Sequence, residues 1–371
     1  MRTERLRLIS RVWLSVMTLA LVSAQAEVIV NGRPAVVLQS PAAKLVIDLG
    51  GGSIVDFHLA AGGLNPLHWI GPADENAVLH PMAHFLCLDR WGQPSEAELG
   101  NGMPFHGEAA RVRWREFDAP EARDGRIIAV MGATLPMAGL EVRRTVRLSE
   151  TTAVFSVSET VSNRNKLGRI YNMVQHATIG PPFLDETTVV DSNVQRGFMQ
   201  SNPMPNPEQP ETWWPEARKQ GQLVDLRHLT SDPDPNVVSF VVDGEFGWVT
   251  ATSVLKELLL GYMWRTVDYP WLNFWRHVAD GKPLARGLEF GTTGLHQPFK
   301  VLTTKPSIFG RPTFSYLDAG ESSTRSYAAF LVKVPRDFRG VESVLYSGSQ
   351  LVVHERSSGR ELKIPADRLF R

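Results

Sequence analysis

The sequence holds a single cysteine, Cys87, so no disulfide can form within the chain. A fold of this chain must therefore be stabilised by its hydrophobic core rather than by covalent cross-links. Cys87 lies in the apolar stretch Phe85–Leu88. We expect it to be a small buried side chain rather than a nucleophile.

An excess of charge of either sign is also missing. Lysine and arginine together number 39, and so do aspartate and glutamate. No basic patch or run of like charge is evident, which excludes nucleic acid as the expected partner. A neutral ligand such as a sugar is compatible with this balance, although the balance does not single it out.

Long hydrophobic runs are limited to the start of the chain. Val12–Val22 is apolar over about 11 residues, whereas a membrane-spanning helix needs about 20. Four arginines precede or border this run, and Ala24–Ala26 follows it with a small-x-small pattern. Together they predict a secretory signal peptide, residues 1–26, cleaved after Ala26. The expected location is the periplasm or the exterior, with no stable membrane span after cleavage.

Convincing amphipathic helices are scarce. Ser253–Met263 is the best short candidate, and a strand is equally compatible with its second half. Leu140–Leu148 and Thr152–Val161 instead alternate between two faces, as half-buried antiparallel strands do. Further strands are expected at Lys44–Leu49, Ile54–Leu59, Val237–Val242, Gly247–Thr252, Arg325–Val334 and Leu351–Glu355. Many short strands predict an all-β fold, a large antiparallel β-sandwich forming one domain over residues 27–371.

One segment, Ser201–Asn236, contains seven prolines and the pair Trp213–Trp214. So much proline excludes a strand in the interior of a sheet. Connections of this length inside a compact domain are commonly functional. The segment is either a lid over a binding site or a surface excursion held down by its tryptophans.

Three short motifs carry candidate chemistry. Glu289 is the isolated carboxylate of Gly287–Gly294, a run that otherwise reads as a buried strand. Alternation places it on the face opposite to its apolar neighbours. His176 and His106 lie at similar junctions between strand and loop. A carboxylate and imidazoles that converge from separate strands could supply both a base and an acid. A glutamate on an exposed edge strand and a histidine in the core are the competing interpretations.

Taken in order, these motifs resemble the galactose mutarotase-like (aldose 1-epimerase) superfamily. The resemblance spans most of the chain after residue 26, as scattered short patterns. They are the hairpin Leu45–Leu59 with Gly63–Trp69 after it, Leu88–Gly92, Phe105–Glu108, Arg144–Leu148 with Val161–Asn163, Tyr171–His176 and Gly287–Phe290. The resemblance implies the superfamily's β-supersandwich with a sugar cleft on the concave face of one sheet. It also implies anomer interconversion of a sugar or glycan ligand without a cofactor.

The resemblance also implies roles for particular residues. Glu289 would be the base that removes the O1 proton, and His176 the acid that protonates the ring oxygen. A carboxylate and an imidazole with ordinary pKa values suit these roles at neutral pH. Ring hydroxyls would be held by His106 and by Arg90, whose guanidinium favours paired oxygens.

Three further residues complete the expected substrate site. Trp275 could stack on the apolar face of a sugar, and Arg276 follows it directly. Glu108 departs from the superfamily pattern, where a glycine stands. It could alter substrate choice, bind a cation or pair with Arg90.

Two other functions remain open at this point. One is a carbohydrate-binding protein without catalysis on the same scaffold. The other is a polysaccharide lyase or hydrolase, which would need a second acid–base partner such as a tyrosine or another carboxylate. A zinc site is not expected at His80 and His84, because Pro81 interrupts their spacing and the glutamate of a zinc hydrolase is missing.

Overall fold

The computed structural model describes residues 28–30, 32–71, 79–229, 232 and 234–370. The predicted signal peptide lies outside these residues. The protein is 54% strand and 4% helix, and its two large sheets are antiparallel. The predicted all-β sandwich is therefore confirmed.

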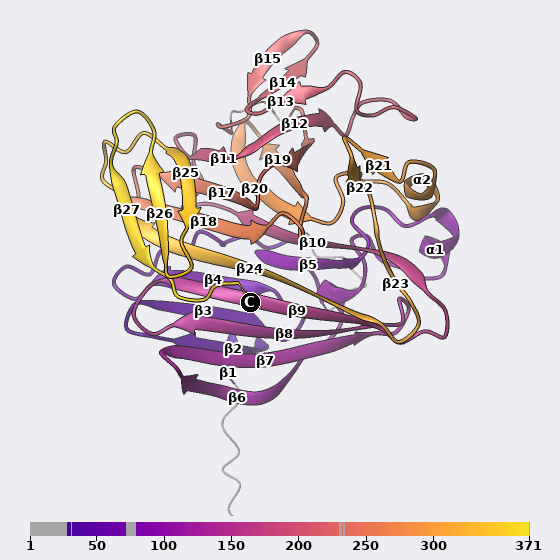
Figure 1. Ribbon diagram of the computed structural model, residues 1–371, viewed down its shortest axis with the longest axis horizontal. Coiled ribbons are helices and arrows are strands. Elements are labelled where there is room, and N and C mark those ends of the chain that lie inside the picture. Colours follow the sequence, from indigo (N-terminus) through magenta and orange to yellow (C-terminus); the bar gives the residue numbers. More distant parts are fainter. Residues whose placement is uncertain (1–27, 31, 72–78, 230–231, 233, 371) are drawn as a thin grey trace, which may run out of the picture.

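Two sheets of twelve and eight strands form the sandwich (Figure 1). The order in the larger sheet is β1 (Val28–Val30), β2 (Arg33–Gln39), β3 (Ala43–Asp48), β4 (Ile54–Leu59), β5 (His84–Asp89), β10 (Arg169–Ile179), β20 (Lys282–Gly291), β19 (Trp271–Ala279), β16 (Val237–Val242), β12 (Val194–Met199) and β13 (Thr212–Trp213), with β23 (Ser315–Leu317) also pairing β10. The order in the smaller sheet is β11 (Val189–Ser192), β17 (Phe246–Ser253), β18 (Leu258–Arg265), β24 (Ser322–Lys333), β9 (Val154–Asn163), β8 (Leu140–Ser149), β7 (Arg126–Leu135) and β6 (Arg115–Arg123). Every expected strand is present.

The remaining elements are small. They are the three-stranded sheet β25 (Val341–Tyr346), β26 (Gln350–Glu355) and β27 (Glu361–Pro365), the hairpins β14 (Glu216–Lys219)–β15 (Gln222–Asp225) and β21 (Ser307–Ile308)–β22 (Arg311–Pro312), the helices α1 (Glu96–Gly100) and α2 (Phe299–Thr304), and a 3₁₀ turn at Ala109–Arg111. Neither α1 nor α2, nor any other helix in the described ranges, could span a bilayer.

The main hydrophobic core lies between the two large sheets, and strand alternation fills it. Along β8, Val142, Val146 and Leu148 are fully buried in this core. Arg144 shares their face, as the alternation predicts, and is 1% exposed. Its Nε donates to Glu159 Oε1 at 2.6 Å, so the buried charge is paired.

The helix considered at Ser253–Met263 does not form. The chain turns after β17 and continues as strand β18. Leu260 and Tyr262 pack in the main core, whereas Leu259 and Met263 pack on the other face against the C-terminal sheet. A strand buried on both faces shows no alternation, which explains why its sequence also resembled a helix.

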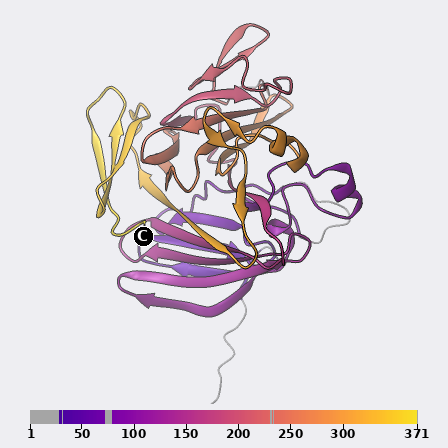
Figure 2. The same ribbon diagram turned by 45° about the vertical axis from the view of Figure 1, so that its right-hand side comes forward.

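The proline-rich segment Ser201–Asn236 is more structured than a loop. It contains β13, β14 and β15 and lies at the top of the molecule in Figures 1 and 2. The ring of Trp214 stacks on that of Phe274 with centroids 4.6 Å apart, whereas Trp213 is 51% exposed. One of the two tryptophans therefore fastens the segment to the large sheet.

Candidate active site

Five neighbouring strands of the larger sheet, β5, β10, β20, β19 and β16, carry the candidate site. Leu288 and Phe290 face the main core, so Glu289 between them faces away from it. The register places His176 of β10 directly opposite Glu289, and Phe85 of β5 opposite His176. Residues that are far apart in sequence thus form one row across the sheet.

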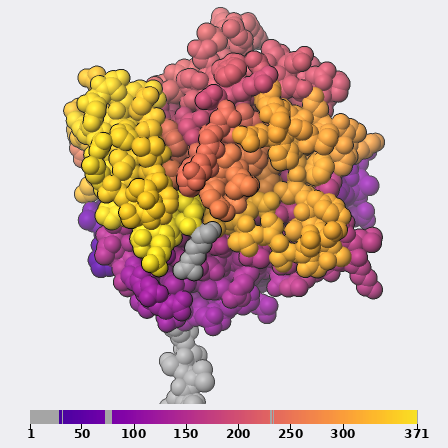
Figure 3. Space-filling view, in the orientation of Figure 1, coloured from indigo at the N-terminus to yellow at the C-terminus, as the bar shows by residue number. Residues whose placement is uncertain are grey.

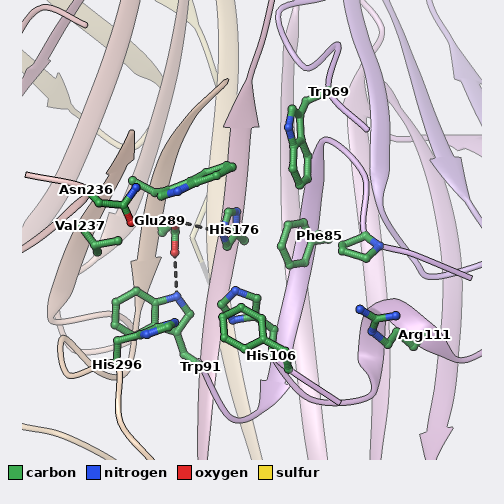
Figure 4. Close-up of a pocket in the computed structure, with 13 residues that line it drawn as sticks. Trp69, Phe85, Trp91, His106, Arg111, His176, Asn236, Val237, Glu289 and His296 are labelled. Atoms are coloured by element: carbon green, nitrogen blue, oxygen red, sulfur yellow. Dashed lines mark hydrogen bonds and ion pairs between the residues drawn. The ribbon is translucent and has the colours of Figure 1, made fainter. Parts of the chain in front are cut away.

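A cavity of about 450 Å³, called here the main cavity, lies over this row (Figure 4). This volume is within the range of small-molecule sites. Its lining consists of Trp69, Pro81, Phe85, Trp91, Phe105, His106, Arg111, His176, Asn236, Val237, Trp275, Glu289 and His296. Glu289 and His176 are both buried, being 1% and 5% exposed.

The Glu289 carboxylate contacts two side chains at once (Figure 4). Oε1 lies 3.1 Å from His176 Nε2, and Oε2 accepts a hydrogen bond from Trp91 Nε1 at 2.7 Å. Gly287 leaves room for this arrangement, since a Cβ there would lie 2.5 Å from Oε1. Any larger residue at position 287 would displace the carboxylate.

The other ring nitrogen of His176, Nδ1, contacts the side chain of Thr178. The Thr178 hydroxyl donates to the His176 carbonyl oxygen at 3.4 Å, and its oxygen lies 2.9 Å from His176 Nδ1. These contacts fit a tautomer in which Nδ1 donates to the Thr178 oxygen, which leaves Nε2 to share a proton with Glu289. The pair is either a neutral carboxyl and imidazole or an ion pair.

Burial favours the neutral form of the pair, because removal from water penalises charge. It raises the pKa of Glu289 to about 8, against the opposing hydrogen bond from Trp91. It also lowers the pKa of His176 to about 3. Both shifts keep one proton between the two residues over a wide pH range.

His106 presents a hydrogen-bond donor to the cavity. Its ring Nδ1 accepts a hydrogen bond from the backbone N–H of Gly92 at 3.1 Å, and the backbone N–H of His106 donates to the Gly92 carbonyl at 3.1 Å. With Nδ1 used as an acceptor, the ring proton lies on Nε2. Burial lowers the pKa of His106 well below its usual value, with smaller effects from His176 and His296, so the ring stays neutral.

Aromatic rings line the walls of the main cavity. The Trp275 ring centroid is 5.7 Å from that of Trp69 in an edge-on arrangement. Phe85 stacks on His176 at 4.2 Å. Such rings offer the apolar faces on which the C–H face of a sugar could stack. Glu289, His176, His106 and Trp275 are thus the predicted site residues that the fold brings together, and their roles stay predictions.

Arg90 does not line the cavity, so its predicted place there was wrong. Its guanidinium binds Asp89 at 2.7 Å and Glu98 at 2.8 Å and is nearly buried. The neighbouring residue Trp91 faces the cavity instead. Arg111, from the 3₁₀ turn, supplies the guanidinium of the lining.

Glu108 and Arg276 also lie outside the lining. The Glu108 carboxylate accepts backbone N–H groups of Met137 at 3.2 Å and Ala138 at 2.8 Å, so it supports the turn between β7 and β8. Both of these contacts are with backbone groups, and neither is the expected ion pair with Arg90. Arg276 is 1% exposed and donates to the Asp234 carbonyl at 2.9 Å. It follows Trp275 on β19, and alternation directs its side chain away from the cavity.

Several lining residues were not singled out from the sequence. Trp69 and Trp91 lie within segments that carried the resemblance, and His296 follows the strand of Glu289. The His296 ring packs edge-on against Trp91 at 4.6 Å. Asn236 ends the proline-rich segment, which was interpreted as a lid or a surface excursion without any of its polar residues being singled out. The two tryptophans could have been predicted as site residues from the sequence, because both lie within segments that resemble the superfamily.

Among the described residues, no three His, Cys, Asp or Glu side chains are arranged so that they could hold a metal ion. His80 Nδ1 lies 3.0 Å from the Arg33 guanidinium. His84 belongs to β5 and contacts Gln175 and Tyr262 in the core. The two histidines therefore do not share a helix face.

Solved structures with the galactose mutarotase-like fold match most of the chain. A galactose mutarotase-like protein from Clostridium acetobutylicum superposes with a TM-score of 0.60 at 13% identity, over 83% of this chain and 98% of that one. A galactose mutarotase related enzyme from Lactobacillus acidophilus has a TM-score of 0.57 at 12% identity, over 81% and 98%. A Klebsiella pneumoniae protein provisionally described as an aldose 1-epimerase has a TM-score of 0.56 at 16% identity, over 79% and 77%.

These likenesses show that the chain has the galactose mutarotase-like fold, which confirms the resemblance inferred from the motifs. At identities this low they show the fold and not the activity. No family model matches the chain, and no curated protein matches it.

Proposed function

We propose that the protein is an aldose 1-epimerase-like isomerase that interconverts the anomers of a reducing sugar. The observation that supports this most directly is the 3.1 Å contact between Glu289 and His176 at the buried end of an aromatic-lined cavity. Two groups that share one proton can exchange it with the two oxygens at the anomeric carbon. The solved structures named above carry related descriptions on the same fold.

Ring opening of the sugar needs one proton removed and one supplied. One member of the pair takes the O1 proton as the C1 carbonyl forms, and the other protonates the ring oxygen as its bond to C1 breaks. Rotation about C1–C2 and closure then give the other anomer. In the neutral pair His176 accepts and Glu289 donates, whereas in the ion pair the roles are exchanged. Closure reverses the transfers, so the pair ends with the proton count with which it began.

Other lining residues would position the sugar. The Nε2–H of His106 can donate to a ring hydroxyl, and Arg111 can bind paired oxygens. Trp275 and Trp69 can stack on the ring. Export forms part of this proposal through the predicted signal peptide. N-terminal sequencing of the expressed protein would test it, because an intact Met1 on the mature protein would contradict cleavage.

Replacing Glu289 by glutamine tests the proposal. Glutamine keeps the size of the side chain and can still bond Trp91 and His176, but it cannot exchange a proton. We expect Glu289→Gln to lower anomer exchange by about 10²–10⁴-fold, with sugar affinity largely retained. Exchange spectroscopy by NMR measures the rate, and calorimetry measures binding.

Glu141→Gln is the matched control, because Glu141 is 39% exposed and pairs with Arg164 on the smaller sheet. Unchanged exchange in Glu289→Gln would eliminate the proposed role. Binding without exchange in the wild-type protein would instead support the carbohydrate-binding alternative. The lyase or hydrolase alternative is less favoured, since the described lining residues of the main cavity include no tyrosine and no second carboxylate.

A further inference from the structure

A second cavity adjoins the main one. It has a volume of about 590 Å³ and is called here the side cavity. Asn236, Val237 and His296 line both cavities. Because these three residues form a common wall, the two cavities lie next to each other over the larger sheet.

The side cavity owes its shape to the proline-rich segment. Arg218, Lys219 and Gln220 come from the β14–β15 hairpin, and Asp234 and Pro235 come from the end of the segment. Each of these belongs to the structured excursion at the top of Figure 1. The excursion therefore adds a compartment beside the candidate active site.

The common wall is held in place by Gln200 of the segment after β12. Its Oε1 accepts the backbone N–H of His296 at 3.0 Å. Its Nε2 donates to Ser239 Oγ at 2.7 Å and to the Gly294 carbonyl at 2.6 Å. With its amide fully used, Gln200 positions His296 at the boundary between the two cavities.

Hydrogen-bonding groups in the side cavity are available to a ligand. Lys219 is already paired, because its Nζ binds Asp232 at 2.7 Å and lies 3.7 Å from Asp234. The groups left for a ligand come from its neighbours. Arg218 is exposed and, among the described residues, contacts no hydrogen-bond or ion-pair partner through its side chain. Gln220, at the tip of the same hairpin, is exposed as well. Polar donors with little aromatic surface suit hydroxyl-rich groups.

We infer that the substrate is a reducing oligosaccharide of at least two sugar units. The unit with the free anomeric carbon occupies the main cavity against Glu289 and His176. The next unit passes Asn236, Val237 and His296 and lies in the side cavity, where Arg218 and Gln220 bind its hydroxyls. This inference rests on the proposed function, because it assigns the substrate class of the same site.

The test compares monosaccharides with reducing disaccharides of different linkage. Anomer exchange is measured by NMR for glucose, galactose, maltose, cellobiose, lactose and melibiose. We expect kcat/KM for at least one disaccharide to exceed that for the monosaccharide at its reducing end by about tenfold. Arg218→Ala should remove most of this advantage, as one lost charged hydrogen bond costs about tenfold.

Arg123→Ala is the matched control. Arg123 is also an exposed arginine beside the turn of a hairpin, β6–β7, with its side chain 67% exposed. The ratio of disaccharide to monosaccharide kcat/KM should be unchanged in this variant. Ratios within about twofold of one for all four disaccharides would overturn the inference, and so would a ratio that Arg218→Ala leaves unchanged.

Failure of the proposed function can be distinguished from failure of this inference. If no sugar shows exchange, the isomerase proposal fails, and calorimetry with the same sugars decides the inference. Tighter binding of a disaccharide than of its monosaccharide, weakened by Arg218→Ala, would support binding across both cavities. Equal affinities would contradict it.

Discussion

Burial of Glu289 and His176 against each other controls how many protons the pair can hold. Each residue alone would be largely charged at slightly acidic pH, since their usual pKa values are 4.5 and 6.5. Within the cavity both shifts favour the uncharged forms. The pair therefore keeps a single proton between a pH of about 3 and about 8, which is the state that anomer exchange requires.

A pH profile of anomer exchange follows from these shifts. Above the pKa of Glu289, about 8, the proton shared by Glu289 and His176 Nε2 is lost, and the pair can no longer donate. Below the pKa of His176, about 3, it gains a second proton and can no longer accept. We expect kcat/KM to be level between these values and to fall about tenfold per pH unit beyond pH 8. A rate that stays constant from pH 6 to 10 would contradict the single-proton pair.

The indole of Trp91 tunes the same equilibrium. Its N–H donates to Glu289 Oε2 and stabilises the carboxylate, so it lowers the pKa of Glu289. In Trp91→Phe we expect the alkaline fall in activity to move to higher pH and the level rate to drop by about tenfold. Rate profiles of both proteins measure this shift.

Trp271→Phe serves as the control for this variant. Trp271 is equally buried and donates its indole N–H to the Pro312 carbonyl at 2.7 Å, outside the main cavity. In Trp271→Phe, kcat/KM should begin to fall at the same alkaline pH as in the wild-type protein. A shift to lower pH in Trp91→Phe would show that the indole does not stabilise the carboxylate.

At the scale of elements, strand β10 carries different chemistry on its two faces. His176 faces the cavity, while Gln175 faces the core, where its Nε2 donates to Glu159 at 2.5 Å and to the Tyr269 hydroxyl at 3.1 Å. Glu159 also accepts from Arg144. A slip of β10 by one residue would exchange the two faces and break this network. The network thus helps to keep His176 opposite Glu289.

Replacing Glu159 by leucine tests the contribution of this network. Arg144 would remain buried and charged without its carboxylate, so we expect a loss of about 3–5 kcal/mol in the free energy of unfolding. Chemical denaturation measures the loss. Adding Arg144→Met in the same protein should recover most of it, because the uncompensated charge is then removed. A loss below about 1 kcal/mol in Glu159→Leu would show that the ion pair is dispensable.

At the scale of the whole molecule, two additions distinguish this chain from a plain two-sheet sandwich. The C-terminal sheet β25–β27 packs on the outer face of the smaller sheet, where Trp248, Met263 and Phe330 would otherwise meet water. Figure 3 shows the C-terminal residues as one body along the side of the molecule. The proline-rich segment is the second addition, and it contributes the side cavity. The C-terminal sheet thus completes a second hydrophobic core, and the proline-rich segment adds a cavity beside the candidate active site.

The sequence by itself determined the strands and the faces on which their side chains lie. Period-two alternation is a local property of the backbone, so it placed Arg144 in the core and Glu289 away from Leu288 and Phe290. The scarcity of helices and the order of the motifs together indicated the fold.

Only the tertiary structure decided which polar groups meet. Trp91 reaches Glu289 across 198 residues of sequence, and Arg111 rather than Arg90 enters the cavity. Such contacts depend on the register of strands that are distant in the chain and on the competition of Asp89 and Glu98 for Arg90. The pKa values of Glu289 and His176 likewise depend on burial, which arises only when the sheets and loops have packed around them.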